Sequence, residues 1–224
     1  MKNAKILKSI INLNLKKKFY HYHIDKLIKQ KIYKLPILSK PNDTSDKAGG
    51  DAFESECPDL TRLYSIIRMR KIITVLEFGS GKSSKVIAEA LRRNKMDYSK
   101  KMSLIRRKNP FHLYTLESEK KYADEVIKSC KDAGLENYVT VQLVKAEQTS
   151  FNNLTCGRYK KIPSVCPDLI YIDGPMPMSY GNSKKQYLNM NHSDITNITC
   201  DLLIIEPMLL PGTIVIIDGM TNNA

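Results

Sequence analysis

The chain has no tryptophan and only four histidines among its 224 residues. Its five cysteines are an odd number, and no two of them are spaced Cys-x-x-Cys, so neither a zinc knuckle nor a disulfide framework is indicated. No apolar run approaches the ~18–20 residues that a membrane-spanning helix needs, and no secretory signal is recognisable. Unpaired thiols are typical of a reducing compartment, so we expect a cytoplasmic protein.

What is present is an ordinary globular composition, 42% hydrophobic and 26% charged, with an uneven distribution of charge. Residues 1–40 contain eleven lysines and one acid, which gives +10 of the total of +13. Their apolar and basic residues have helical spacing up to Pro36, so we expect a basic helical extension. Packing on the domain and contact with an anionic surface, lipid or nucleic acid, are the alternatives for it. Residues 41–50 are rich in turn formers and predict a linker, followed by the folded domain 51–224.

Short β-branched runs alternate with helical patterns through this domain. Such alternation is typical of parallel strands joined by crossover helices. We therefore expect an α/β fold: a Rossmann-like, open, mostly parallel sheet with helices on both faces. Two stretches, 94–111 and 174–193, are expected to be irregular inserts. The expected strands are 71–78, 112–117, 138–146, 168–173 and 213–218, and the expected helices are 58–70, 83–93, 119–134 and one within 194–208.

An acidic residue stands at or directly after the end of every expected strand. Ligands of open α/β sheets bind beyond the carboxyl ends of the strands, where these side chains would gather. A single acid in such a place is usually a solvated turn residue, whereas five of five favour a ligand site. The acids are Glu77, Glu117, Glu147, Asp173 and Asp218.

A glycine-containing turn, Gly79-Ser80-Gly81, follows the first of these strands. Glycine allows a tight turn and a close approach of the backbone to a ligand. The next helix begins near Ser83, and its N-terminus presents free N–H groups to a carboxylate or phosphate. Glu117 can accept hydrogen bonds from both hydroxyls of a ribose, and Glu77 suits a ligand that carries an ammonium group.

Three kinds of nucleotide site are compatible with this turn. A dinucleotide site needs Gly-x-Gly-x-x-Gly, but Ser84 replaces the third glycine. A phosphate-binding P-loop needs a glycine where the chain has Leu76. The third alternative is a site for S-adenosylmethionine (SAM).

Four stretches resemble, in order and with similar spacing, the motifs of class I SAM-dependent methyltransferases. They are VLEFGSGKSS, LYTLESEKKYADEV, DLIYIDGP and LLPGTIVIIDG, and the resemblance covers about residues 60–219. The DGP, IEPMLLPGT and DGMTNN stretches are most similar to an uncharacterised bacterial group. The resemblance implies SAM-dependent methyl transfer, with oxygen of a small molecule or sugar as the expected acceptor. An NAD-dependent oxidoreductase and a non-catalytic binding module are the alternatives.

The resemblance also implies roles for individual residues. Glu77 and the turn Gly79–Gly81 match the loop that cradles the methionine part of SAM, and Glu117 matches the acid that holds the ribose. Ala146 and Glu147 match positions at the adenine edge, and Asp173 matches the acid near the methyl group and the acceptor.

Some O-methyltransferases of this class hold a divalent metal with acids after strands four and five. Asp173 and Asp218 match two of these ligands, but Gly219 stands where the third is expected, and Asn222 or Asn223 would have to replace it. Without a metal, Asp173 or His192 is the candidate general base.

Members of this class usually continue beyond the fifth strand with a helix and further strands. The present chain ends at Ala224. The fifth strand is then expected to be an apolar edge, which is prone to pair with another chain. We expect a truncated form, with pairing between two copies through this edge as the alternative.

Overall fold

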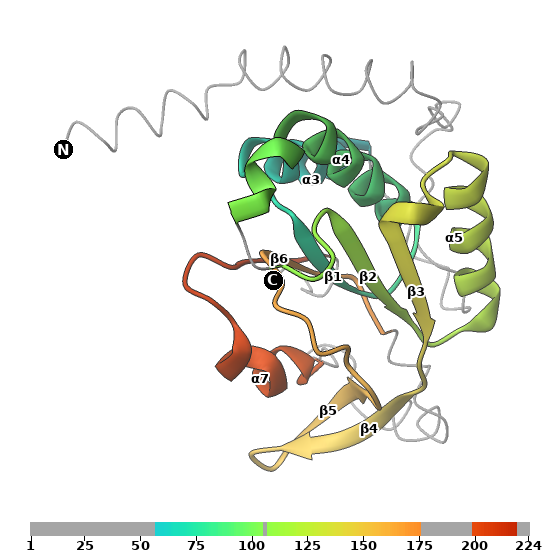
Figure 1. The fold of residues 1–224 in the computed structure, drawn as a ribbon. Helices are drawn as coiled ribbons and strands as arrows, with labels where there is room; N and C mark the ends of the chain where they lie inside the picture. Colours follow the sequence, from blue (N-terminus) through green and yellow to red (C-terminus); the bar gives the residue numbers. More distant parts are fainter. Residues whose placement is uncertain (1–56, 105–106, 176–198, 219–224) are drawn as a thin grey trace.

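A five-stranded sheet in the order β3-β2-β1-β6-β7 forms the centre of the molecule (Figure 1). The computed structural model describes residues 57–104, 107–175 and 199–218; the predicted extension and linker lie outside them. Every neighbouring pair of strands is parallel, as predicted. The strands are β1 (Thr74–Phe78), β2 (His112–Glu117), β3 (Val139–Leu143), β6 (Leu169–Ile172) and β7 (Ile214–Ile217).

The central strands are mostly apolar, as expected for strands that are covered on both faces. All residues of β1 and of β6 are buried. The outer strand β7 alternates instead, with Val215 and Ile217 exposed by 38% and 56%. Within the described residues β7 pairs only with β6, so it has the apolar edge that the sequence predicted.

Helices cover both faces of the sheet, as expected. On one face, α3 (Cys57–Met69), α4 (Lys82–Tyr98) and α5 (Lys120–Asp132) pack on alternate strand residues such as Val75. On the other face, α7 (Asp201–Ile205), which η5 (Glu206–Met208) follows, packs on the intervening residues through Ile205. Figure 1 shows α3 and α4 side by side on one side of the sheet and α7 on the other. No helix in the described ranges is both long and apolar enough to cross a membrane.

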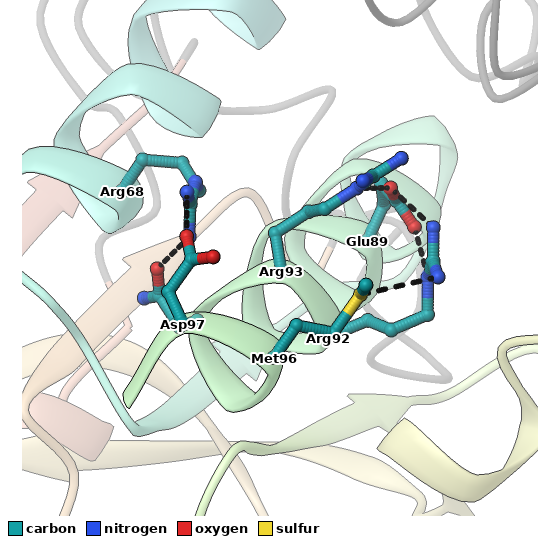
Figure 2. Close-up of polar contacts among 7 residues, drawn as sticks. Arg68, Glu89, Arg92, Arg93, Met96 and Asp97 are labelled. Atoms are coloured by element: carbon teal, nitrogen blue, oxygen red, sulfur yellow. Dashed lines mark hydrogen bonds and ion pairs between the residues drawn. The ribbon is translucent and has the colours of Figure 1, made fainter. Parts of the chain in front are cut away.

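One ion pair joins α3 to α4, and two more connect residues within α4 (Figure 2). Arg68 of α3 reaches Asp97 of α4, with 2.5 Å between nitrogen and oxygen. About two turns earlier along α4, the buried carboxylate of Glu89 accepts from Arg92 over 2.6 Å and from Arg93 over 2.8 Å. The buried Glu89 charge is therefore compensated by two guanidinium groups, as a buried carboxylate requires.

The insert expected to be irregular at 94–111 is largely helical. Helix α4 continues to Tyr98 and passes into a 3-10 helix, η2 (Ser99–Leu104). The buried amide of Asn94 donates to the carbonyl oxygens of Ile67 (3.0 Å) and Ile72 (2.7 Å). This contact fixes the last turns of α4 against the end of α3, so that the helix extends beyond the apolar pattern that predicted it.

The third expected strand, 138–146, is also wrong at its end. A short 3-10 helix, η3 (Glu136–Tyr138), precedes β3, which stops at Leu143. The chain then forms a separate antiparallel hairpin of β4 (Ala146–Phe151) and β5 (Leu154–Tyr159). Its two-residue turn has positive φ at Asn152 (49°) and at Asn153 (65°), the geometry that asparagine tolerates well.

An ion pair closes the amino end of the sheet. Arg107 donates to one carboxylate oxygen of Asp168 over 2.7 Å and also to the carbonyl oxygen of Cys166. The other oxygen of Asp168 accepts the backbone N–H groups of Ile73 (3.2 Å) and Thr74 (3.0 Å). Arg107, near the end of the stretch 94–111, thus connects this stretch to the start of β1 and β6.

Candidate functional site

The loop that follows β1 touches the loop that follows β6, backbone against backbone. Gly79 has a φ of +85°, and a Cβ atom there would lie 2.8 Å from the nitrogen of Gly174. A Cβ atom on Gly174 would likewise lie 2.9 Å from the Cα of Gly79. The Gly79 N–H also donates to the carbonyl oxygen of Leu116 over 2.9 Å, which connects the loop to β2. Neither glycine can be replaced without displacing backbone.

Gly81, at the other end of the same turn, lies in a different environment. Its backbone is extended, with φ of −179°, and a Cβ atom there would meet no atom within 4 Å. Open space therefore borders the turn beside Gly81, at the start of α4. This is the geometry that lets a ligand approach the backbone closely.

The carboxylate of Glu117, at the end of β2, is turned onto this loop. One oxygen accepts from Ser80 twice, from the backbone N–H at 3.0 Å and from the hydroxyl at 2.7 Å. The other oxygen accepts the N–H groups of Ser118 (2.7 Å) and Glu119 (2.9 Å). The Glu117 residue is only 5% exposed. The structure thus places the acid and the glycine turn together, while the role of Glu117 in holding a ribose stays a prediction.

Glu77 lies beneath the loop and is completely buried. Its two oxygens accept the hydroxyls of Ser83 (2.7 Å) and Ser84 (2.6 Å), and Ser84 in turn accepts the N–H of Gly81 over 3.1 Å. Burial raises the pKa of Glu77 to about 7, against the opposing effect of the two serine hydroxyls. Glu77 and Ser83 position the first turn of α4 from below, and their direct contact with a ligand stays a prediction.

Asp173 follows β6 at the same edge of the sheet. Desolvation is the main cause that raises its pKa to about 7, and the negative charges of Asp218 and Glu117 add to it. Its side chain is exposed in the fold, which argues for a smaller desolvation effect. The upward direction holds nevertheless, because both neighbouring carboxylates act in that sense. A carboxylate with a pKa near neutrality can exchange a proton at physiological pH.

The predicted metal ligands are Asp173 and Asp218. Asp218 follows β7 and accepts a hydrogen bond from the hydroxyl of Tyr171. In the part of the chain that the structure describes, no three His, Cys, Asp or Glu side chains are grouped so that they could hold a metal ion. The described donor set does not complete a metal site, and the assignment of the two aspartates stays a prediction. His192, Asn222 and Asn223 lie outside the described residues.

The two residues predicted at the adenine edge, Ala146 and Glu147, begin the β4–β5 hairpin rather than ending β3. Glu147 forms ion pairs with Arg158 of β5 (2.6 Å) and with Lys160, directly after that strand (3.3 Å). These hydrogen bonds, Arg158 first, lower the pKa of Glu147. The carboxylate therefore has cationic partners within its own hairpin, and its contact with an adenine stays a prediction.

Sequence reasoning missed two residues that shape this site. Gly174 was recognised only as part of the DGP motif, although its missing side chain permits the contact with Gly79. Ser84 was noted only as a departure from the dinucleotide pattern, although it is buried and bonds to both Glu77 and Gly81. For Gly174, the signal in the sequence was a glycine directly after the acid that ends a strand. For Ser84, it was a pair of serines at the start of α4.

No protein-family model and no curated protein matches the sequence. Among solved structures, the chain is similar to an O-methyltransferase from Streptomyces achromogenes in complex with SAM, at 15% identity and a TM-score of 0.42, over 76% of this chain and 63% of that one. It is also similar to a methyltransferase from Podospora anserina bound to SAH (19%, TM-score 0.44, 74% and 53%). An O-methyltransferase from Bacillus cereus in complex with SAH is a third (16%, 0.43, 77% and 66%). The chain thus spans about half to two thirds of the length of these proteins.

Proposed function

We propose that the protein is a SAM-dependent methyltransferase that transfers a methyl group to oxygen of a small molecule or sugar. The observation that carries the proposal is the position of Glu117, a buried carboxylate turned onto a glycine turn with open space beside Gly81. A nucleoside placed there would meet an acceptor for its ribose and a backbone that it can approach closely. The ordered motifs that resemble class I methyltransferases support the same assignment.

The alternative, an NAD-dependent oxidoreductase, is less well supported by the start of α4. The third glycine of a dinucleotide fingerprint lets the helix pack closely against the strand. Its position is occupied here by Ser84, whose hydroxyl lies between the Glu77 carboxylate (2.6 Å) and the Gly81 N–H (3.1 Å). The sequence therefore builds this junction from a hydrogen-bonded serine and a buried acid instead of a glycine contact.

In the proposed reaction, the residues present supply binding and proton transfer. SAM, when bound, supplies an electrophilic methyl group on its sulfonium. Glu117 would hold the ribose, and the turn Gly79–Gly81 would hold the amino-acid part. Asp173, whose pKa is raised, would take the proton of an acceptor hydroxyl. Much of the rate would come from aligning acceptor and methyl donor.

Calorimetric titration with S-adenosylhomocysteine (SAH) and with NAD tests the proposal. We expect the wild-type protein to bind SAH and not NAD; the reverse result would reject the assignment. Glu117→Gln should weaken SAH binding by up to about tenfold, because a hydrogen bond to a charged group contributes about 1.5–3 kcal/mol and the Ser80 hydroxyl, which holds the same oxygen, offsets part of it.

Glu119→Gln is the matched control for this variant. Glu119 lies two residues away and contributes only its backbone N–H to Glu117. Its exposed side chain can lose its charge while that N–H remains. Equal loss of SAH affinity in both variants would show a general effect of charge and contradict the specific role of Glu117.

We further infer a cytoplasmic location and a small-molecule acceptor. Four of the cysteines, Cys130, Cys156, Cys166 and Cys200, are unpaired in the described part of the chain, the usual state of thiols in a reducing compartment. Localising a tagged full-length chain by microscopy and cell fractionation tests the first inference. Contact of residues 1–40 with an anionic surface and pairing of two copies through β7 stay predictions; vesicle sedimentation and light scattering would test them.

A further inference from the structure

We propose that the hydroxyl of Ser80 is an internal substitute for a ribose hydroxyl, and that it thereby limits how tightly the site holds a nucleoside. The inference rests on the proposed function, because it concerns the same carboxylate. Its basis is that Glu117, which is buried, accepts four hydrogen bonds of 3.0 Å or less from the chain itself.

An ionised carboxylate has about four lone-pair positions for hydrogen bonds. Three of the four donors to Glu117 are backbone N–H groups, of Ser80, Ser118 and Glu119, and the loop after β1 and the start of α5 fix their positions. The fourth donor is the Ser80 hydroxyl at 2.7 Å. It alone can leave by rotation of a side chain between staggered rotamers, without moving the backbone.

A ribose with two free hydroxyls needs acceptor positions on this carboxylate. The Ser80 hydroxyl is the donor that can give way to the first of them. One charge-assisted hydrogen bond is then exchanged for another of similar strength, so the net gain from that ribose hydroxyl is small. Ser80 stabilises the ligand-free arrangement of Glu117 and competes with the ligand for the same oxygen.

This competition determines whether the affinity for the nucleoside rises or falls when the Ser80 hydroxyl is removed. Removing the hydroxyl raises the free energy of the ligand-free protein more than that of the complex, so the affinity for the nucleoside must increase. If the Ser80 hydroxyl contacted the ligand directly, its removal would lower the affinity. The two arrangements therefore predict opposite changes in the dissociation constant.

The experiment compares Ser80→Ala with Ser118→Ala in the full chain. The hydroxyl of Ser118 lies 3.5 Å from the same carboxylate, too far for a strong hydrogen bond, and its backbone N–H remains in the variant. We expect SAH titration to give a dissociation constant about three- to tenfold lower for Ser80→Ala and unchanged for Ser118→Ala. Without SAH, the melting temperature of Ser80→Ala should be lower than that of wild type, and the increase on adding SAH should be larger.

Ser80→Thr retains a hydroxyl and should retain the wild-type dissociation constant, which separates the loss of the hydrogen bond from a general change in the loop. If Ser80→Ala does not fold, Ser80→Gly removes the same hydroxyl and carries the same expectation. An unchanged or higher dissociation constant in the variants without the hydroxyl, with normal binding by wild type, overturns this inference and leaves the proposed function standing. Absence of SAH binding to wild type overturns both.

Discussion

The two ends of the central sheet both carry buried or half-buried acids, but they compensate them differently. At the amino end, Asp168 has a guanidinium partner, Arg107, at 2.7 Å and two backbone N–H groups. At the carboxyl end, the described donors to Glu77 and Glu117 are serine hydroxyls and backbone N–H groups, and desolvation, together with the negative charges of Asp218 and Glu117, raises the pKa of Asp173.

The difference separates an acid with a cationic partner from acids that have only neutral donors among the described contacts. A guanidinium–carboxylate pair is a complete structural unit, and nothing else is needed to neutralise it. A carboxylate held by neutral donors has no cationic partner, so a ligand that brings hydroxyl, ammonium or sulfonium groups could supply one. Strongly shifted pKa values of this kind gather at functional sites more often than elsewhere.

The largest expected loss of stability comes from adding a side chain where the two loops at the carboxyl end are in contact. Gly79→Ala should lower the free energy of unfolding by at least about 3 kcal/mol, because it combines a positive φ with a Cβ 2.8 Å from backbone. Urea denaturation measures this. Gly81→Ala is the matched control in the same turn, where the Cβ meets open space, and it should change stability by less than about 1 kcal/mol. Equal losses in the two variants would contradict the asymmetry of the turn.

The second prediction concerns the acid at the carboxyl end that has only neutral donors. Because burial raises the pKa of Glu77 to about 7, the native chain binds more protons than the unfolded chain between pH 4.5 and 7. The free energy of unfolding therefore falls as pH rises through this window, by up to about 3 kcal/mol from this group. Glu77→Gln lacks this contribution, so its stability relative to wild type should increase from pH 5 to pH 8.

Thermal unfolding of both chains across this pH range measures the difference. Titrating groups that do not interact with Glu77 act equally in the two chains and cancel, whereas Asp173 interacts with Glu77 and contributes to the difference. A stability difference that does not change with pH would show that Glu77 stays ionised throughout.

A smaller loss of stability is expected when the acid at the amino end of the sheet loses its cationic partner. Arg107→Ala leaves Asp168 without its guanidinium partner and should lower the free energy of unfolding by about 2 kcal/mol. It should leave SAH affinity unchanged, because the pair lies at the opposite end of the sheet. A calorimetric titration that showed weaker SAH binding would mean that the two ends are coupled.

The sequence predicted the sheet because its central strands are continuous β-branched and apolar runs, which buried parallel strands require. It also predicted the end of α5, since Gly134 takes the positive φ of 67° that a helix C-terminus favours. The carboxyl-end acids could be predicted as a group, because parallel strands end at one edge.

The rest depended on contacts between distant parts of the chain. The hairpin β4–β5 turns at two asparagines, a signal that competes with many other uses of asparagine. The length of α4 depends on Asn94 reaching the carbonyls at the end of α3. The burial of Glu77 under the loop follows from where Ser83 and Ser84 meet it, and that is set by the packing of α4 on β1.

Gly79 and Gly174 are nearly a hundred residues apart in sequence, but their backbones are in contact. The loop after β1 and the loop after β6 therefore determine each other's position. If the turn after β1 is grafted into another sheet, Gly174 has to be grafted with it, because the conformation of each loop depends on its contact with the other. Libraries that vary residues around the candidate site should therefore hold both glycines constant.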